Sequence, residues 1–345
     1  MESRAAVIAV DANGADQGPG AVAEGVRRSG VPTLLFGPRL ELLGAGDRAE
    51  LVDAPETIKA GDEPVAAVRS RKDASIVQAA AAVADGRADA LVSAGSTGPT
   101  LAAGTIEIKR IRGVFRPALA VLLPVPHGPV LLLDAGASVQ ARPEHLVQFA
   151  YMGACFMEAC VGVERPRVGL LSVGEESGKG TPEVLAAHDR LAEGTLDFAG
   201  NVEGFDLPRA TVDVLVADGF AGNIALKVLE SSMKTLSGEI SERVRSGPVS
   251  SVGGLLIRPK LRGLREELDP ERVGGAILLG LRKPVVVAHG SFGPRGIENA
   301  VRLAQRAVTE DMVGRTAAAL EAAGALRSAP AGSVVGATSE TSSDA

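Results

Sequence analysis

The stretch VLVADGFAGN, residues 214–223, decides the fold class that this sequence predicts. A short run of branched apolar residues ends at Asp218, Gly219 follows at once, and a segment with helical character comes next. The same order recurs in VIAVDANGAD (7–16), ALVSAGSTGP (90–99), VLLLDAGASV (130–139), GLLSVGEESG (169–178) and VVVAHGSFGP (285–294). Continuous apolar runs that alternate with helices indicate parallel strands buried on both faces. We therefore expect an α/β protein with a mostly parallel sheet.

The glycine-rich loops that follow these six runs predict a binding site. Right-handed crossovers bring the carboxyl ends of parallel strands to one edge of a sheet, and ligands bind in the crevice beyond them. In any one loop the glycine can simply form a tight turn, but six such loops together favour a site. We expect one concave rim of backbone N–H groups at one edge of the sheet.

The composition is that of an ordinary globular protein, because 46% of the 345 residues are apolar and 23% are charged. A net charge of −6 argues against a general nucleic-acid binder, and the absence of Trp removes one residue type that stacks on bases. The longest apolar run, ALAVLLPVPHGPVLLL (118–133), contains three prolines and a histidine, so it does not predict a membrane span. The charged amino terminus does not resemble a signal peptide, and we expect a cytoplasmic protein.

We expect residues 1–326 to form a single α/β domain, which has the length to divide into two lobes. The remaining residues, 327–345, are small and polar and predict a disordered tail. Cys155 and Cys160 lie in an apolar stretch at a helical spacing that suits a disulfide poorly, and no clustered histidines suggest zinc. We interpret both cysteines as core residues and not as carriers of an acyl group.

The loop LSVGEESGKGTPEV (171–184) resembles a nucleotide-binding loop, but its spacing is wrong for one. A Walker loop needs four residues between its first glycine and the Gly-Lys pair, and Ser or Thr directly after the lysine. Here three residues separate Gly174 from Gly178, and Gly180 follows Lys179. A lysine between two glycines, beside backbone N–H donors, is a good receptor for a small phosphate. The loop therefore predicts a site for inorganic phosphate or a phosphate transition state.

Four aspartates, Asp11, Asp16, Asp134 and Asp218, end separate strand-like runs. One interpretation is a metal cluster, and the other is that each caps the helix or loop that follows it. We do not predict a metal site or a cofactor.

The segment from Ser246 to Asp269 interrupts the strand–helix rhythm and predicts a helical insertion over about 246–270. If a helix begins near Pro259, an apolar face forms that contains Leu261 and Leu264. Basic residues lie around this face: Arg258, Lys260, Arg262 and Arg265. Such a helix suits an anionic membrane or an acidic protein, or alternatively packing on its own domain or on a second subunit.

A family resemblance rests on motifs that occur in a fixed order over residues 6–310: VDANGAD, SAGSTG, RPALAVLLP, LDAGAS, PRVGLLSVGEESGKG, GNVEGFD, DVLVADGFAGNIALK, GGAILLG and AHGS. The chain resembles the PlsX family of bacterial phosphate acyltransferases, which move a fatty acyl group from acyl carrier protein to phosphate. GNVEG and DGFAGNIALK are the specific motifs. The chain departs from the family pattern at Asn13, where Met is usual, at Ala15, where Gly is usual, and at Ser138, where Asn is common.

The resemblance implies a three-layer α/β/α fold similar to isocitrate and isopropylmalate dehydrogenases and to phosphate acetyltransferases. It also implies a homodimer that associates peripherally with the membrane, with acyl carrier protein and inorganic phosphate as substrates. A transferase for short acyl-CoA substrates, a nicotinamide-dependent decarboxylating dehydrogenase and a non-catalytic membrane adaptor are the alternatives. The dehydrogenase would need clustered aspartates and substrate arginines, which the sequence does not suggest.

We expect bound phosphate to attack the thioester carbonyl directly, without a protein nucleophile. Lys179 positions the phosphate, and Asn223 orients the reacting group or donates to the oxyanion. His289 either protonates the leaving thiolate or has a structural role, while Asn201 and Glu203 shape the pocket. The other residues assigned to substrate or phosphate binding are Asp11, Gly14, Ser96, Thr97, Gly98, Asp134, Gly178, Gly180, Asp218 and Gly222.

Overall fold

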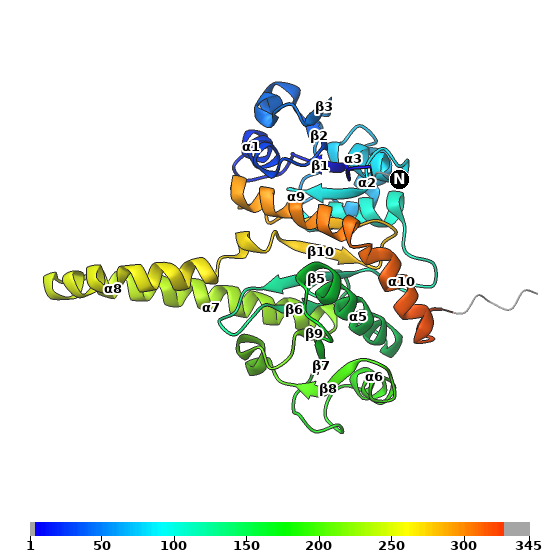
Figure 1. Ribbon diagram of the computed structural model, residues 1–345, viewed down its shortest axis with the longest axis vertical. Helices are drawn as coiled ribbons and strands as arrows, with labels where there is room; N and C mark the ends of the chain where they lie inside the picture. The colour runs from blue at the N-terminus through cyan, green and yellow to red at the C-terminus, as the bar shows by residue number, and fades with distance from the viewer. Residues whose placement is uncertain (1–3, 328–345) are drawn as a thin grey trace, which may run out of the picture.

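The computed structural model describes residues 4–327, and these form an α/β fold around an eleven-stranded sheet (Figure 1). The strands follow one another across the sheet in the order β3 (Ala49–Asp53), β2 (Thr33–Gly37), β1 (Ile8–Asp11), β4 (Ala90–Ser93), β11 (Val285–Val287), β10 (Ala276–Leu279), β5 (Ala118–Leu123), β6 (Val130–Leu133), β9 (Val214–Val216), β7 (Arg167–Leu171) and β8 (Asp197–Val202). Most neighbouring strands pair in parallel, so the expected α/β class with a mostly parallel sheet is confirmed.

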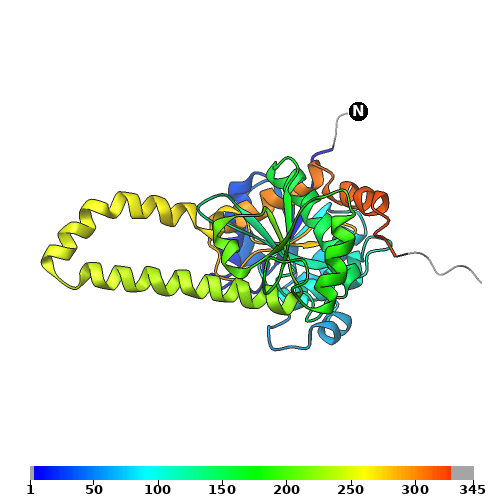
Figure 2. The ribbon, with the colours of Figure 1, turned by 90° about the horizontal axis from the view of Figure 1, so that it is seen from below.

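Helices cover both faces of the sheet and complete three layers (Figure 2). One layer contains α1 (Pro19–Ser29), α5 (Pro143–Phe156), α6 (Pro182–Ala192), α9 (Pro294–Thr309) and α10 (Met312–Ala322). The other contains α2 (Pro64–Ser70), α3 (Ser75–Ala84), α4 (Thr97–Ala103) and the start of α7 (Gly219–Arg245). Short 3₁₀ or π-helical turns are η1 (Arg39–Ala45), η2 (Gly104–Ile108), η3 (Met157–Val161), η4 (Gly204–Arg209) and η5 (Pro270–Arg272).

The core lies on both faces of the sheet because alternate strand residues point to opposite sides. In β1, Ile8 and Val10 pack into the apolar cluster under α1 and α9, whereas Ala9 packs into the cluster under α3. All four residues of β1 are buried. This is why its sequence is a continuous apolar run and not an alternating one.

Three antiparallel pairs divide the sheet into two halves that run in opposite directions. β10 is antiparallel to both β11 and β5, and β5 is antiparallel to β6. The carboxyl ends of β1, β4 and β11 therefore lie at one edge of the sheet, which we name the Asp11 edge. The carboxyl ends of β6, β7, β8 and β9 lie at the other, which we name the Lys179 edge. The expectation of one rim formed by six loops was wrong.

The physical reason is the short link within the apolar segment 118–133. Residues 124–129 join β5 to β6, and these six residues, which include three prolines and one glycine, make a turn but not a crossover. A connection between parallel strands needs a dozen or more residues, so a link of this length only allows β6 to pair antiparallel with β5. The strands that pair in parallel with β6 and its neighbours inherit this reversed direction.

A helical hairpin projects from the sheet, formed by the distal part of α7 and by α8 (Pro248–Glu267) (Figures 1 and 2). The buried residues of α7 end at Leu226, and α8 has none. The insertion therefore begins within α7, well before residue 246. The expected helix start near Pro259 was wrong, because α8 begins at Pro248 and contains Pro259 in its interior.

Two further expectations concern the ends of the chain and the membrane. The tail expected over 327–345 lies, apart from Arg327, outside the described residues. Among residues 4–327, no helix combines the length and the apolar character that a bilayer crossing requires.

Candidate functional site

The Lys179 loop follows β7 and is folded tightly on itself. The Lys179 backbone N–H donates to the Glu176 carbonyl at 3.0 Å, and the Ser172 hydroxyl donates to the Lys179 carbonyl at 3.0 Å. The Lys179 side chain passes over Gly174, where an added Cβ would lie 3.1 Å from its Cγ. Lys179 itself is exposed. The loop thus holds its backbone rigidly and leaves the cation free to meet a ligand.

The two glycines beside Lys179 have different roles. Gly180 has φ +121°, and a Cβ there would lie 2.8 Å from Val184 Cγ1, so this position requires glycine. Gly178 has no atom near its ideal Cβ and faces open space. Directly after the loop α6 begins, and the Thr181 hydroxyl accepts from the Val184 N–H at 3.4 Å. The amino terminus of a helix beside an exposed lysine favours an anion.

Asn201 and Glu203, from the end of β8, lie beside this loop. Asn201 is buried, and its side-chain amide donates to the carbonyls of Glu176 at 2.8 Å and Lys179 at 3.1 Å. The Glu203 backbone N–H donates to Asp206 Oδ2 at 3.0 Å, which starts η4. The structure therefore brings Asn201 and Glu203 to the same edge as Lys179, and Asn201 contacts the lysine's own backbone.

Asp134 and Asp218 fix backbone, as the capping interpretation predicts. Asp134 is completely buried and accepts from the N–H groups of Leu119, Gly136, Ala137 and Ser138 and from the Ser138 hydroxyl at 2.7–3.1 Å. Asp218 accepts from the N–H groups of Phe220 and Ala221, both at 2.9 Å. Ser138, which departs from the family pattern, thus contributes two donors to Asp134.

The first turn of α7 packs directly on the loop after β6. A Cβ on Gly219 would overlap the Ser138 carbonyl, and one on Gly222 would lie 2.0 Å from the Asp134 carbonyl. Only glycine permits this approach at either position. Asn223 is exposed, and its Oδ1 would lie 3.5 Å from a Cβ built on Gly136. The glycines of the GFAGN motif therefore bring Asn223 against the glycine-rich loop that begins at Asp134.

The remaining predicted residues lie at the Asp11 edge. Asp11 is buried and accepts from the hydroxyls of Ser75 at 2.6 Å and Ser93 at 2.9 Å and from the Asn13 N–H at 3.2 Å. Burial raises the pKa of Asp11 to about 6. Gly14, at φ +88°, packs its backbone on Gly95, where a Cβ would lie 2.8 Å from the Gly95 Cα. Ser96, Thr97 and Gly98 form the start of α4 at this edge.

Sequence reasoning missed Ser75 and the role of Asn13 in this group. The Asn13 side-chain amide donates to the carbonyl of Ala54 at 3.0 Å, to the Ser75 hydroxyl at 2.9 Å and to the Glu56 carbonyl at 3.3 Å. This departure from the family pattern therefore ties the loop after β1 to the loop after β3. Only tertiary structure shows the contact, because 62 residues separate Asn13 from Ser75.

His289 also lies at the Asp11 edge, not with Lys179. It follows β11 and is exposed, and its Nδ1 is 2.8 Å from the Ser291 hydroxyl. The predicted catalytic residues are thus divided within one chain: Lys179 and Asn223 at one edge and His289 at the other. Among residues 4–327, no group of three or more Cys, His, Asp and Glu side chains is arranged to hold a metal ion.

The two cysteines are free and buried in α5 and η3. Burial raises the pKa of Cys155 to about 11 and that of Cys160 to about 12. The thiolate, which is the nucleophilic form, is therefore disfavoured at both positions. Their environment supports the interpretation as core residues.

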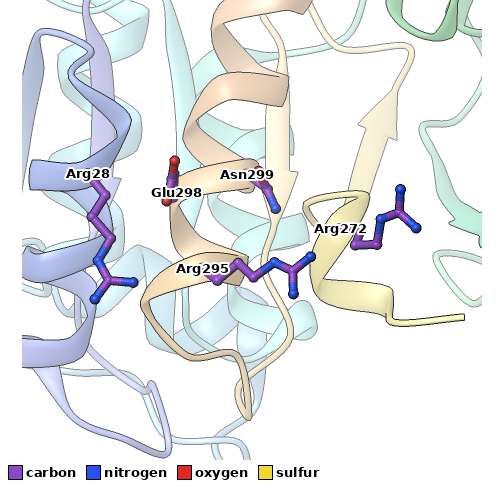
Figure 3. Close-up of a pocket in the computed structure, with 5 residues that line it drawn as sticks. All are labelled: Arg28, Arg272, Arg295, Glu298 and Asn299. Atoms are coloured by element: carbon purple, nitrogen blue, oxygen red, sulfur yellow. The ribbon is translucent and has the colours of Figure 1, made fainter. Parts of the chain in front are cut away.

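A cavity of about 500 Å³ lies between α1, η5 and α9, and none of the predicted site residues lines it (Figure 3). Three arginines, Arg28, Arg272 and Arg295, line it together with Glu298 and Asn299. Arg295 Nη1 is 3.6 Å from both Glu266 Oε1 and Asp269 Oδ2 at the base of the helical hairpin. No sequence pattern indicated this cavity, because its residues come from three separate segments of the chain.

The fold matches solved structures of acyl-transferring enzymes. A phosphotransacetylase from Streptococcus pyogenes aligns with a TM-score of 0.60 at 18% identity, covering 88% of this chain and 94% of that one. A branched-chain phosphotransacylase from Enterococcus faecalis V583 aligns with a TM-score of 0.56 at 16% identity, covering 88% and 99%. At these identities the likeness defines the fold alone, which is that of the phosphotransacylases.

The sequence comparisons define the family. The sequence model of a family described as "Fatty acid synthesis protein" matches residues 6–315. A phosphate acyltransferase of Heliobacterium modesticaldum is 42% identical over 318 residues, covering 89% of this chain and 95% of the relative. One from Geobacillus thermodenitrificans is 42% identical over 323 residues, covering 91% and 98%. The chain belongs to the PlsX family of phosphate acyltransferases. It is an acyltransferase of fatty acid and phospholipid synthesis, which confirms the resemblance and sets aside the dehydrogenase alternative.

Proposed function

We propose that the enzyme transfers a fatty acyl group from acyl carrier protein to inorganic phosphate. A phosphate oxygen attacks the thioester carbonyl, the carbon–sulfur bond breaks, and the proton of hydrogen phosphate ends on the carrier's thiol. The products are acyl phosphate and free carrier. The observation that carries the proposal is the Lys179 loop, which presents an exposed lysine between two glycines beside the amino terminus of α6.

In this proposal Lys179 and the first turn of α6 hold the phosphate, and Asn223 donates toward the carbonyl oxygen as charge develops on it. Holding two reactants in line is worth up to ~7–11 kcal/mol in favourable cases. One donor to an oxyanion contributes typically ~2.7–4 kcal/mol. Asp134 and Asp218 support the role of Asn223 indirectly, because Asp218 caps the helix that carries Asn223 and Asp134 fixes the loop beside it. No protein nucleophile is needed, which agrees with the buried, protonated cysteines.

The acyl part of the substrate finds apolar surface at the same edge. Four of the strands that end at the Lys179 edge, β6, β7, β8 and β9, are each followed by an exposed large apolar side chain: Val139, Val173, Phe205 and Phe220. Exposed apolar groups that gather in one place mark binding surfaces. A fatty acyl chain that leaves the thioester carbonyl beside Asn223 would cover them, whereas a short acyl group would not.

The helical hairpin supports contact with the carrier protein. Arg258, Arg262 and Arg265 follow one side of α8 at positions i, i+4 and i+7, and Arg272 and Arg295 line the cavity at the base of the hairpin. Lys260 points elsewhere on the helix. Acyl carrier proteins are acidic, so a line of guanidinium groups complements them and speeds encounter.

Peripheral contact with the membrane is part of the same proposal, but the structure changes the residues assigned to it. The most exposed apolar residues of α8 lie near the tip of the hairpin: Val249, Val252, Leu255 and Leu256 are between 61% and 85% exposed. Leu261 and Leu264, which the sequence suggested, are 39% and 44% exposed. An apolar tip beside basic residues suits an anionic lipid surface.

The homodimer is also proposed from α7. Leu236 and Ile240 lie at helical spacing on the same side as Gly222 and Leu229, which pack on the domain. Beyond the sheet this side of α7 stays apolar but becomes exposed, by 63% at Leu236 and 43% at Ile240. A second copy of the chain that packs here would bury both residues.

The test is a direct assay of acyl phosphate, with long-chain acyl carrier protein, long-chain and short-chain acyl-CoA, and phosphate varied separately. We expect phosphate-dependent product from the long-chain carrier substrate. Product from short acyl-CoA alone would favour the alternative transferase, and no product from any donor would favour the non-catalytic adaptor.

A further inference from the structure

We propose that Asn201 is a positioning residue that fixes the backbone of the phosphate-binding loop and thereby the place of Lys179. The inference rests on the proposed function, because it assumes that Lys179 binds phosphate. It assigns to Asn201 no contact with substrate. Its whole effect passes through the carbonyl groups at the two ends of the turn from Glu176 to Lys179.

An irregularity in β8 sets the direction of the Asn201 side chain. The register between β7 and β8 shifts after the pair Val168–Phe198, so Ala199 is an extra residue in β8. Gly200, with φ +91°, absorbs this bulge. Because side chains alternate along a strand, one extra residue moves every later side chain to the opposite face. Asn201, which pairs with Leu170, therefore reaches the loop after β7.

Both hydrogen bonds that the Asn201 side chain makes go to this loop. Its Nδ2 bridges the carbonyls of Glu176 and Lys179, and the Ser172 hydroxyl donates to the same Lys179 carbonyl. The Asn201 Oδ1 is buried and has no hydrogen-bond partner among the described residues. A buried acceptor without a partner lowers the stability of the fold. The favourable contribution of the Asn201 side chain therefore comes from the two hydrogen bonds that hold the loop.

The clamp matters because the Lys179 ammonium has no hydrogen bond or ion pair of its own among residues 4–327. Its place is set by the backbone from which the side chain leaves, and that backbone is held by Asn201 and Ser172. If the turn opens, the point charge moves away from the phosphate. The expected signature is thus a defect in phosphate use, and not in use of the acyl donor.

Asn201→Asp is the decisive variant, since it keeps the shape and replaces the amide donor by an acceptor. An ionised carboxylate there faces two carbonyl oxygens and repels both. We expect KM for phosphate to rise by on the order of tenfold or more, with KM for the acyl donor within about twofold of wild type. A protonated carboxyl can still donate one hydrogen bond, so the defect should shrink as pH falls.

The matched control is Asn299→Asp, which makes the same chemical change in α9. The Asn299 Nδ2 donates to the Glu271 carbonyl at 2.8 Å, far from β7 and β8 in the sheet order. We expect its KM for phosphate to equal that of wild type. Ser172→Ala is the second variant, because it removes the other donor to the Lys179 carbonyl; it should raise KM for phosphate by a smaller factor, even if Asn201→Asp does not fold.

A double-variant cycle separates this inference from the proposed function. Phosphate affinity measured by calorimetry should fall in Lys179→Ala, and adding Asn201→Asp should lower it no further. If Lys179→Ala binds phosphate normally, the proposed function fails. If Lys179→Ala loses phosphate affinity while Asn201→Asp and Ser172→Ala keep it, or if the two effects simply add, the positioning role is overturned and the proposed function stands.

Discussion

At the residue scale, the polar groups of this enzyme divide into those that hold backbone and those that face solvent. The side chains of Asp134, Asp218 and Asn201 form hydrogen bonds with backbone groups of loops or of a helix start. The side chains of Lys179 and Asn223 are exposed to solvent. Buried carboxylates and amides are favourable only when partners satisfy them. Asp134 and Asn201 are accordingly buried and Asp218 is half-buried, whereas the two residues proposed to act in the site are exposed.

The first prediction concerns Lys179. Replacement by Ala should raise KM for phosphate sharply or abolish turnover while the protein stays folded, because the cation that attracts the anion is lost. Steady-state kinetics with varied phosphate, together with circular dichroism, measure this. Lys59→Ala removes an exposed lysine from the loop after β3 and should change neither quantity. Normal phosphate dependence in folded Lys179→Ala would contradict the assignment.

The second prediction concerns the pH dependence that Asp11 imposes on stability. Burial raises the pKa of Asp11 in the folded protein from 3.8 to about 6. Between these values the folded protein holds a proton that the unfolded chain has lost, so the free energy of unfolding falls as pH rises from about 4 to 6. At about 1.4 kcal/mol per tenfold change in affinity, the loss is on the order of 3 kcal/mol.

Asp11→Asn does not titrate and should lack this loss. Denaturant unfolding at pH 4 and pH 7 compares the two proteins. We expect Asp11→Asn to gain stability relative to wild type on going from the lower to the higher pH. A difference between the two proteins that stays constant across the range would mean that Asp11 is ionised in the folded state well below pH 6.

At the element scale, α7 joins two environments. Its first turns pack on the loop after β6 through Gly219 and Gly222, and its distal part leaves the sheet with α8 (Figure 2). Asp218 caps the amino terminus of α7, where its negative charge is also favoured by the positive end of the helix dipole. This one helix therefore connects the proposed site to the hairpin, which is the surface proposed to contact other molecules.

The third prediction uses two glycines of α7 that have opposite requirements. A Cβ at Gly222 would lie 2.0 Å from the Asp134 carbonyl, so Gly222→Ala should cost about 1–3 kcal/mol or more and impair activity. Gly238 has no atom near its ideal Cβ, so Gly238→Ala should stabilise the protein by about 0.5–1 kcal/mol. Thermal and denaturant unfolding measure both. Equal effects of the two substitutions would contradict the close packing of α7 on the β6 loop.

The fourth prediction concerns the tip of the hairpin. Val252→Glu with Leu256→Glu should abolish binding to anionic vesicles, because two charges enter the most exposed apolar surface of α8. Activity on soluble acyl carrier protein should remain. Leu261→Glu with Leu264→Glu, at less exposed positions, is the matched control and should bind vesicles more nearly as wild type does.

Salt distinguishes apolar insertion from charge attraction in this experiment. Attraction of the arginines alone weakens over a Debye length of ~8 Å at physiological salt, whereas insertion of apolar side chains is far less sensitive. Flotation with vesicles at low and high salt measures the difference. If the leucine pair, and not the tip pair, controls binding, the membrane contact lies along α8 and not at its end.

At the scale of the whole molecule, the opposed halves of the sheet separate the Asp11 edge from the Lys179 edge. Apolar surface remains exposed on the projecting part of α7, and the cavity of Arg28, Arg272 and Arg295 lies where the hairpin meets the domain (Figures 1 and 3). The surfaces proposed for lipid, carrier and second subunit are all placed on or near the hairpin. The proposed chemistry is placed at the edge from which α7 starts.

The fifth prediction tests the dimer. Leu236→Glu with Ile240→Glu should shift the protein to a monomer in sedimentation analysis, because charges replace the apolar side of α7. Ser231→Glu with Thr235→Glu lies on the opposite side of α7 and should leave the association state unchanged. An unchanged sedimentation coefficient in the leucine–isoleucine variant would place the dimer contact elsewhere or remove it.

The sequence by itself determined the α/β class, the layered arrangement and the family. These can be inferred from local patterns, which do not depend on contacts between distant segments. Buried strands such as β1 read as continuous apolar runs, and motifs such as GNVEG and DGFAGN keep their spacing along the chain. The loop around Lys179 could be predicted as a phosphate site for the same reason, since the glycines and the lysine on which the prediction rests lie within a few residues.

Only the tertiary structure decided which loops share an edge. Strand direction depends on how neighbours pair, and the antiparallel returns of β10 and of β6 reversed half of the sheet, separating His289 and Asp11 from Lys179. The partners of Asn201 and Asn13 were likewise hidden, because they come from segments distant in sequence. A pattern along the chain indicates the secondary structure and burial that each segment favours, but strand pairing across the sheet decides which residues come into contact.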